Sequence, residues 1–135
     1  MKAEVVWIDR GWQPVAVGFV PSAKAWDREM KRLRTPKPRP AYPSIANFGG
    51  HAQLFENDTT RESVILVTVG NGSERDALEV IMTIAHESVH AWQFICRVIG
   101  ENSPGIETEA YAIESISRAL IEAYTSTQGK GKKWL

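Results

Sequence analysis

Residues 74–99 read ERDALEVIMTIAHESVHAWQFICRVI, and this stretch decides the fold. It is rich in helix-compatible residues, Ser73 with Asp76 is typical of an N-terminal capping box, and Gly100 suits the position just past a helix end. Apolar side chains occupy most of the circumference of this helix. The sequence therefore predicts one long, largely buried helix against which the rest of the chain packs.

A polar strip on that helix carries the motif with the clearest chemistry. His86 and His90 are four residues apart, which places them on one helix face with Glu87 beside them. Such a pair can simply hydrogen-bond to its neighbours, but neutral imidazole is a common zinc ligand and the intervening glutamate can reach a metal-bound water. The spacing therefore favours a zinc site with Glu87 as its general base.

A third ligand is expected downstream, because a catalytic zinc usually takes three protein ligands and one water. Pro104 and Gly105 are expected to open a second helix that runs to about Tyr124. Glu109 lies near its apolar stripe, whereas Glu107 and Glu114 fall on the outer face, where Glu114 and Arg118 form a possible ion pair. The stripe comprises Ile106, Ala110, Ile113, Ile116, Ser117, Leu120 and Tyr124. Glu109 is therefore the predicted third zinc ligand.

The pattern of His86-Glu-Ser-Val-His90 followed by Glu109-Ala-Tyr-Ala112 resembles the gluzincins, zinc peptidases with a glutamate as third ligand. An alternative alignment uses Glu107, but it places Tyr111 where those relatives have aspartate. Stretches such as Gly18–Trp26 and Val89–Gln93 also resemble small phage- or prophage-encoded metallopeptidases. The resemblance implies zinc as cofactor and a peptide or protein as substrate.

The remaining elements predict a single α+β domain over residues 1–135. Alternation and turn residues predict strands at 3–8, 15–20, 50–55 and 64–69, and a helix that begins near Ser22 with a core stripe of Ala23, Trp26, Met30 and Leu33. Residues 35–43 form a Pro-rich connector and 128–135 a flexible basic tail. This order is similar to the minimal zincin layout, in which a small mixed or antiparallel sheet packs on an active-site helix and a second, ligand-bearing helix.

By that analogy the strand at 50–55 lines the substrate cleft. An exposed edge strand can bind an extended peptide through its main chain, and glycine permits a close backbone approach. His51 is a candidate to stabilise the oxyanion, although a lone strand histidine is more often a partly exposed polar residue. The predicted substrate contacts are Gly50, Gln53 and Arg97, the last of which could instead pair with Glu101.

Composition narrows the partners and the compartment. The formal net charge is zero and no membrane-spanning stretch is apparent, so neither nucleic acid nor a membrane is the expected partner. A basic cluster of Lys31, Arg32, Arg34, Lys37 and Arg39 is interpreted as a solvated edge. Cys96, the only cysteine, is expected in the core, and no signal peptide is apparent. The expected location is cytoplasmic, in the host cell if the phage resemblance holds.

These features predict a zinc-dependent hydrolase, a metallopeptidase that cleaves amide bonds with zinc-activated water. One alternative is a catalytically silent zincin-fold protein that binds or regulates a host partner. Another is a hydrolase of non-peptide substrates or an amidase of cell-wall peptides. The sequence leaves the substrate and the oligomeric state open.

Overall fold

The computed structural model describes residues 4–43, 49–70, 74–131 and 133, and these form a mixed α+β fold. Strands β1 (Val6–Trp7) and β2 (Ala16–Phe19) come first, followed by helix α1 (Ala23–Arg32). Strands β3 (Gly50–Glu56) and β4 (Ser63–Val69) form a hairpin, and helices α3 (Ala77–Ile99) and α4 (Ile106–Thr125) complete the chain. The predicted α+β class is confirmed.

The four strands form one mixed sheet in the order β1-β2-β4-β3. Strand β2 runs parallel to β4, whereas β1 and β3 pair antiparallel with their neighbours. The two predicted hairpin strands match β3 and β4 within one residue at each end, while the first two strands are shorter than predicted. Strand β3 therefore forms one edge of the sheet, as the sequence analysis expected.

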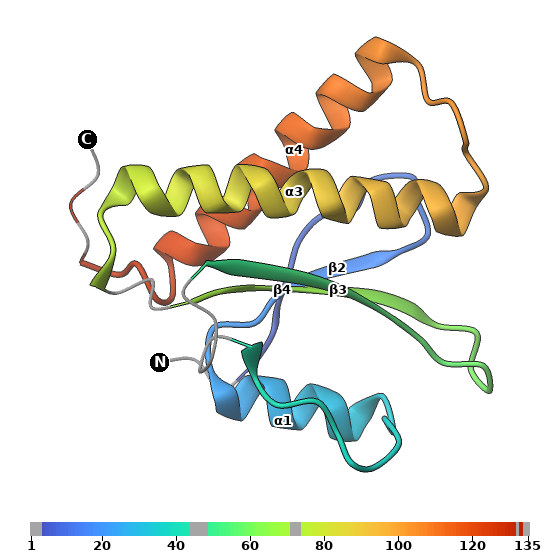
Figure 1. Ribbon diagram of the computed structural model, residues 1–135, viewed down its shortest axis with the longest axis horizontal. Coiled ribbons are helices and arrows are strands. Elements are labelled where there is room, and N and C mark those ends of the chain that lie inside the picture. The colour runs from blue at the N-terminus through green and yellow to red at the C-terminus, as the bar shows by residue number, and fades with distance from the viewer. Residues whose placement is uncertain (1–3, 44–48, 71–73, 132, 134–135) are drawn as a thin grey trace.

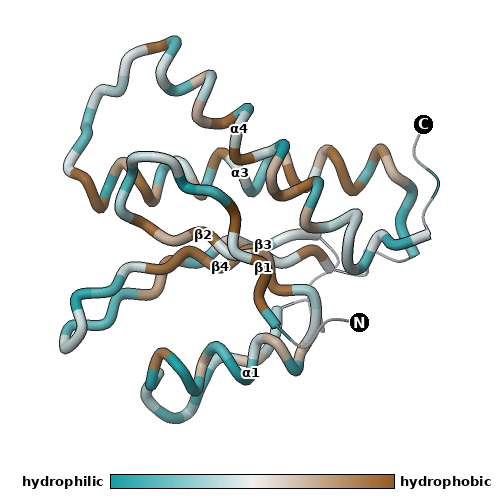
Figure 2. The backbone as a smooth tube through the Cα atoms, turned by 180° about the vertical axis from the view of Figure 1, so that it is seen from behind, coloured by the Kyte–Doolittle hydropathy of each residue, from teal (hydrophilic) through white to brown (hydrophobic). Residues whose placement is uncertain are grey.

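Helices cover both faces of the sheet, with α3 and α4 on one side and α1 on the other (Figure 1). Strand β4 lies inside the sheet and is buried on both faces, which explains its continuous apolar run Val64–Val67. Ile65, Val67 and Val69 pack toward α3 and α4, whereas Val64 and Leu66 pack toward α1. Figure 2 shows this hydrophobic centre, with a more hydrophilic α1 outside it.

The start of α3 differs from the prediction. The helix begins at Ala77, because Asp76 has an extended backbone and its side chain accepts a hydrogen bond from the Glu79 N–H, which makes Asp76 the N-cap. Ser73 lies outside the described residues. The predicted end is confirmed, since Gly100 adopts the left-handed conformation with a φ of 75°.

Helix α4 has the predicted bounds, but its apolar stripe was wrong at the N-terminal end. Ile106 is 85% exposed and Ala110 is also exposed, whereas Ile116, Leu120 and Tyr124 are buried. The first turns of α4 rise away from the sheet, so only the later turns have a core to enter (Figure 1). The expected pair of Glu114 with Arg118 is replaced by one between Arg118 and Glu122.

The residues where α4 meets the predicted tail pack against the fold. Thr127 and Gly129 are buried, and the Gln128 side chain donates a hydrogen bond to the Val69 carbonyl at 3.4 Å. The Gly129 N–H also donates to the Tyr124 carbonyl. The segment after α4 therefore closes the end of the sheet.

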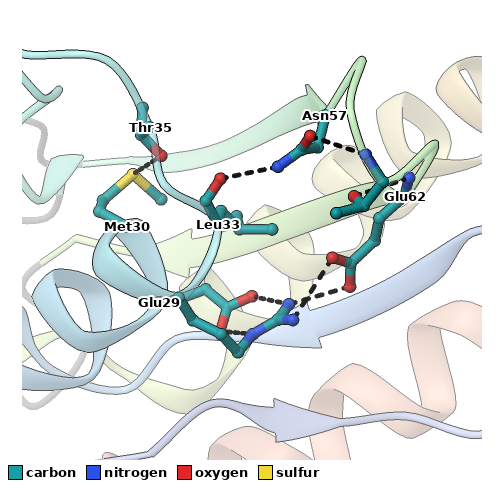
Figure 3. Close-up of polar contacts among 8 residues, drawn as sticks. Glu29, Met30, Leu33, Thr35, Asn57 and Glu62 are labelled. Carbon is teal, nitrogen blue, oxygen red and sulfur yellow. Dashed lines mark hydrogen bonds and ion pairs between the residues drawn. The ribbon is translucent and has the colours of Figure 1, made fainter.

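One member of the predicted basic edge has a structural role. Arg32 donates to Glu29 and to Glu62, and thereby links α1 to the β3–β4 hairpin (Figure 3). Glu29 is buried at 5% exposure, while the Arg32 side chain is half exposed. The hydrogen bonds that Arg32 donates to Glu29 raise the pKa of its guanidinium, and they outweigh the lowering by partial burial. Arg32 therefore compensates a buried charge.

None of the helices among the described residues is both long and apolar enough to cross a membrane.

We expect Arg32→Met to destabilise the protein by about 1–2 kcal/mol, because it leaves the buried Glu29 carboxylate without its cation. Urea unfolding at neutral pH would measure this change. The matched control is Arg118→Met, which removes an exposed ion pair with Glu122 and should change the stability by less than about 0.5 kcal/mol. Equal losses in the two variants would contradict the role of Arg32.

Candidate functional site

The two histidines of α3 point at a common place outside the helix. His86 Nε2 and His90 Nε2 lie 3.2 Å apart, and the two rings meet edge to face with centroids 4.8 Å apart. Both side chains are exposed. Two imidazole nitrogens that converge in this way match the donors and spacing that a helix offers to zinc.

Gln93 orients one of these rings. Its Oε1 lies 2.9 Å from His90 Nδ1, a contact that is a hydrogen bond in the tautomer with the proton on Nδ1. Nε2 then keeps the lone pair that a metal needs, which is the usual effect of a second hydrogen bond on a histidine ligand. The sequence analysis missed this role of Gln93, which the spacing His-x-x-Gln indicates.

Glu87 faces inward, between α3 and the edge strand β3. It is only 6% exposed, and desolvation raises the pKa of its carboxyl, partly opposed by positive charge on His86, His90 and His51. Gly50 is the reason that the carboxyl fits. A Cβ at Gly50 would lie 2.9 Å from Glu87 Cγ and 2.5 Å from Thr83 Cγ2. The predicted close approach at Gly50 is thus made by α3 itself.

A second contact between α3 and the start of β3 comes from Arg75, which the sequence analysis missed. Its guanidinium donates to Thr83 Oγ1 at 2.5 Å and to the Gly49 carbonyl at 3.5 Å. Arg75 thus fastens the start of β3 to the helix turn before the histidines. No spacing pattern in the sequence identifies this contact, because Arg75 and Gly49 are distant along the chain.

His51 and Gln53 lie on the other face of β3. Gly50 faces α3, and Ala52 and Leu54 pack with the core under that helix, whereas Phe55 contacts Trp26 on the α1 side. Alternation along the strand therefore places His51 and Gln53 with Phe55. The His51 Nε2 lies 3.3 Å from Gln53 Oε1. Roles for both residues in substrate handling stay predictions.

Glu109 faces inward, as predicted, but toward a different part of α3. Its Oε2 accepts a hydrogen bond from the Trp92 indole N–H at 3.0 Å, and it lies close enough to Cys96 to help raise the pKa of that thiol, which burial raises most. Trp92 is two residues from His90, roughly 200° around the helix. The structure therefore brings His86, His90 and Glu87 together and holds Glu109 elsewhere.

The other predicted positions are on the surface or in the core. Arg97 is exposed and its guanidinium lies 5.3 Å above the Phe94 ring. Glu107 is exposed and Cys96 is buried, as the sequence analysis expected, and Tyr111 is exposed at the edge of a cleft between α3 and α4.

The hollow beside the histidines is small and open, with a volume of about 360 Å³. Its lining comprises Gly49, Gly50, Met82, Thr83, His86 and Glu87. A larger cleft of about 510 Å³ lies between residues 8–13, α3 and α4, next to Trp92. The chemistry of the histidine pair and the position of β3 identify the smaller hollow as the candidate site.

Within the described residues, no group of three His, Cys, Asp or Glu side chains converges to hold a metal ion. His86 and His90, two of the three expected zinc ligands, lie together. The described part of the chain supplies no third ligand beside them. The comparisons with known proteins do not place the chain in a family, since no family model, curated protein or solved structure matches it.

We expect Gly50→Ala to destabilise the protein by about 1–3 kcal/mol, because the new methyl group would overlap Thr83 and Glu87. Thr83→Ser removes the nearest overlapping atom and keeps the hydroxyl that Arg75 contacts. The double variant should therefore recover part of the loss in urea unfolding. Strictly additive effects would contradict the proposed contact.

We expect Glu87→Gln to stabilise the metal-free protein near pH 7.5 and to have little effect near pH 4. A carboxyl whose pKa is raised by folding binds its proton more tightly in the folded state, so stability falls as the pH rises through that pKa. Glutamine removes this loss. Thermal unfolding with a chelator at both pH values would measure it, with the exposed Glu114→Gln as control. A lower midpoint for Glu87→Gln at pH 7.5 would contradict the buried position.

Proposed function

We propose that this chain is a zinc-dependent hydrolase, a metallopeptidase of the gluzincin type with a minimal zincin-like fold. The observation that carries the proposal is the convergence of His86 Nε2 and His90 Nε2 beside the buried Glu87. A mixed sheet with an antiparallel edge strand next to the histidine helix supports the zincin-like arrangement.

His86 and His90 are the proposed zinc ligands, with Gln93 keeping His90 in the tautomer that offers Nε2. Zinc bound at such a site lowers the pKa of a coordinated water and polarises a carbonyl. Glu87 is the proposed general base. Because desolvation raises the pKa of its carboxyl, Glu87 is better able to hold a proton taken from water and to pass it to the leaving amine.

The edge of the sheet is the proposed support for the substrate. Strand β3 pairs with β4 on one side only, so its other edge can bind an extended peptide through main-chain hydrogen bonds. Gly50 places this strand within contact distance of the Glu87 side chain. A peptide bound along β3 would thus pass the general base.

Glu109 is the third ligand that the gluzincin resemblance and the facing of α4 predict for a single chain. To bind a metal at His86 and His90, Glu109 would have to leave the Trp92 indole. The same contact favours the second candidate function, a catalytically silent zincin-fold protein that binds a host partner.

Metal analysis and peptide cleavage together test the proposed function. The wild type should bind zinc and cleave peptides from a broad library, and His90→Ala should lose zinc. Glu87→Gln should keep zinc and lose at least about a hundredfold in turnover, because it removes the general base. Glu114→Gln, which changes an exposed carboxylate on α4, is the control and should behave as wild type.

Zinc binding without cleavage, together with capture of one host protein, would favour the silent binding protein. Equal turnover of Glu87→Gln and wild type would remove the proposed mechanism. If wild type and His90→Ala both fail to bind zinc, the metal site itself is wrong.

A further inference from the structure

An apolar seam lies on the exposed face of α3, directly beside the histidines. It is formed by Leu78, Met82, Ala85 and Val89, whose spacing of four, three and four residues is that of a coiled-coil contact line. Leu78 is 54% exposed, Met82 62% and Val89 37%, and Ala85 is exposed as well. Side chains of this size and spacing are normally covered by another helix.

The described residues outside α3 leave this seam uncovered. Helix α4 contacts α3 through the side that carries Trp92, and the sheet contacts α3 through residues such as Val80, Ile84 and Glu87. Figure 1 shows α4 crossing α3 and leaving its N-terminal part free on the side away from the sheet. The seam and the histidine pair therefore face solvent together.

We infer that a second copy of this chain packs antiparallel along the seam and that its Glu79 completes the zinc site at His86 and His90. This inference depends on the proposed function only in requiring zinc at these two histidines. It deepens the proposed site, because two histidines leave the site one protein ligand short within the described part of one chain.

The sequence of α3 suits such a pairing. A two-fold axis near the middle of the seam pairs Leu78 with Val89 and Met82 with Ala85, so each large side chain meets a smaller or branched one. In this antiparallel register, the two sequence numbers of every pair have the same sum. Glu79 of one copy therefore lies level with position 88 of the other. Position 88 is midway between His86 and His90, about 3 Å along the axis from each.

Glu79 is also on the correct side of the helix. Glu79 and His86 are seven residues apart, so both occupy the same flanking position of the repeat, and in an antiparallel pair these positions face each other. Glu79 is free to exchange partners, because its side chain is 57% exposed and its ion pair with Arg75 spans 3.5 Å. A carboxylate opposite two imidazoles supplies the charge that a divalent cation requires.

The pairing places the second copy beside the hollow and not between α3 and β3. Met82 belongs both to the seam and to the lining of the hollow, so the second copy would border the hollow there, while Glu87 keeps its inward contact with Gly50. The seam is only twelve residues long, and an interface of this size is too small to hold a dimer by apolar contact alone. Dimerisation should therefore require zinc, with two ions for each dimer.

Sedimentation velocity of the full chain with Zn²⁺ or with a chelator tests the inference. The wild type should be a dimer with Zn²⁺ and a monomer with the chelator. Glu79→Gln should lose the dimer and bind zinc about tenfold to a hundredfold more weakly. Leu78→Lys, at an exposed seam position outside the hollow, should lose the dimer while its circular dichroism and melting temperature stay those of wild type. Glu114→Gln, at an exposed position on α4, should dimerise normally.

Mixing two defective chains gives the sharper test. Glu79→Gln keeps both histidines, and the double variant His86→Ala/His90→Ala keeps Glu79, so each alone should remain monomeric with Zn²⁺. Their mixture should form a heterodimer that holds one zinc ion. A merely structural role for Glu79 would not produce this recovery.

Two results would overturn the shared site. In the first, the wild type binds zinc tightly as a monomer, and zinc binding is lost in Glu109→Gln and kept in Glu79→Gln. The proposed function would stand in that case. The other is a dimer that forms equally well with the chelator or with Glu79→Gln. If the wild type binds no zinc, both the inference and the proposed metal site fail.

Discussion

The contact between α3 and the edge strand at Gly50 is the constraint on which the site depends. Because Gly50 has no side chain, Thr83 and Glu87 can lie against the strand backbone, which sets the distance between helix and sheet. This approach buries the Glu87 carboxyl while the histidines one residue before it and three after it remain outside. The same short helical segment thus presents a desolvated acid on one side and two exposed imidazoles on the other.

The core makes that contact stable. Strand β4 is buried on both faces and supports β3 through an uninterrupted antiparallel ladder from Gly50 to Glu56. Arg75 adds a polar fastening between the start of β3 and Thr83, and Arg32 holds α1 to the hairpin at its other end. A rigid strand beside the helix is what a site needs in order to hold its groups in fixed geometry.

The exposure of the histidine face links the chemistry of the site to its assembly. Zinc ligands in a hydrolase are normally held by several elements, whereas His86 and His90 come from one helix and have only Gln93 as a described hydrogen-bond partner beyond each other. The adjoining apolar seam exposes Leu78, Met82 and Val89 on the same helix. A single partner helix would remedy both deficits, which is why the two are best considered together.

Local sequence signals determined most of the helices and strands of this protein. Periodicity and end signals identified both long helices and the hairpin strands, because helix caps and alternation act over a few residues. The spacing of His86, Glu87 and His90 likewise determined their common position, since they share one helix. Those signals were wrong where the end of an element depends on packing. Two examples are the short strand β1 and the exposed first turn of α4.

Only the tertiary structure decided what the helices meet. The inward facing of Glu109 was predicted correctly, but the side of α3 that it reaches depends on how α4 crosses α3, and this crossing places it at Trp92 instead of the histidines. The contacts of Arg75 with Gly49 and of Gly50 with Thr83 join segments that are distant along the chain. A helix repeat fixes angles within one helix, whereas contacts between elements follow from the shape of the whole core.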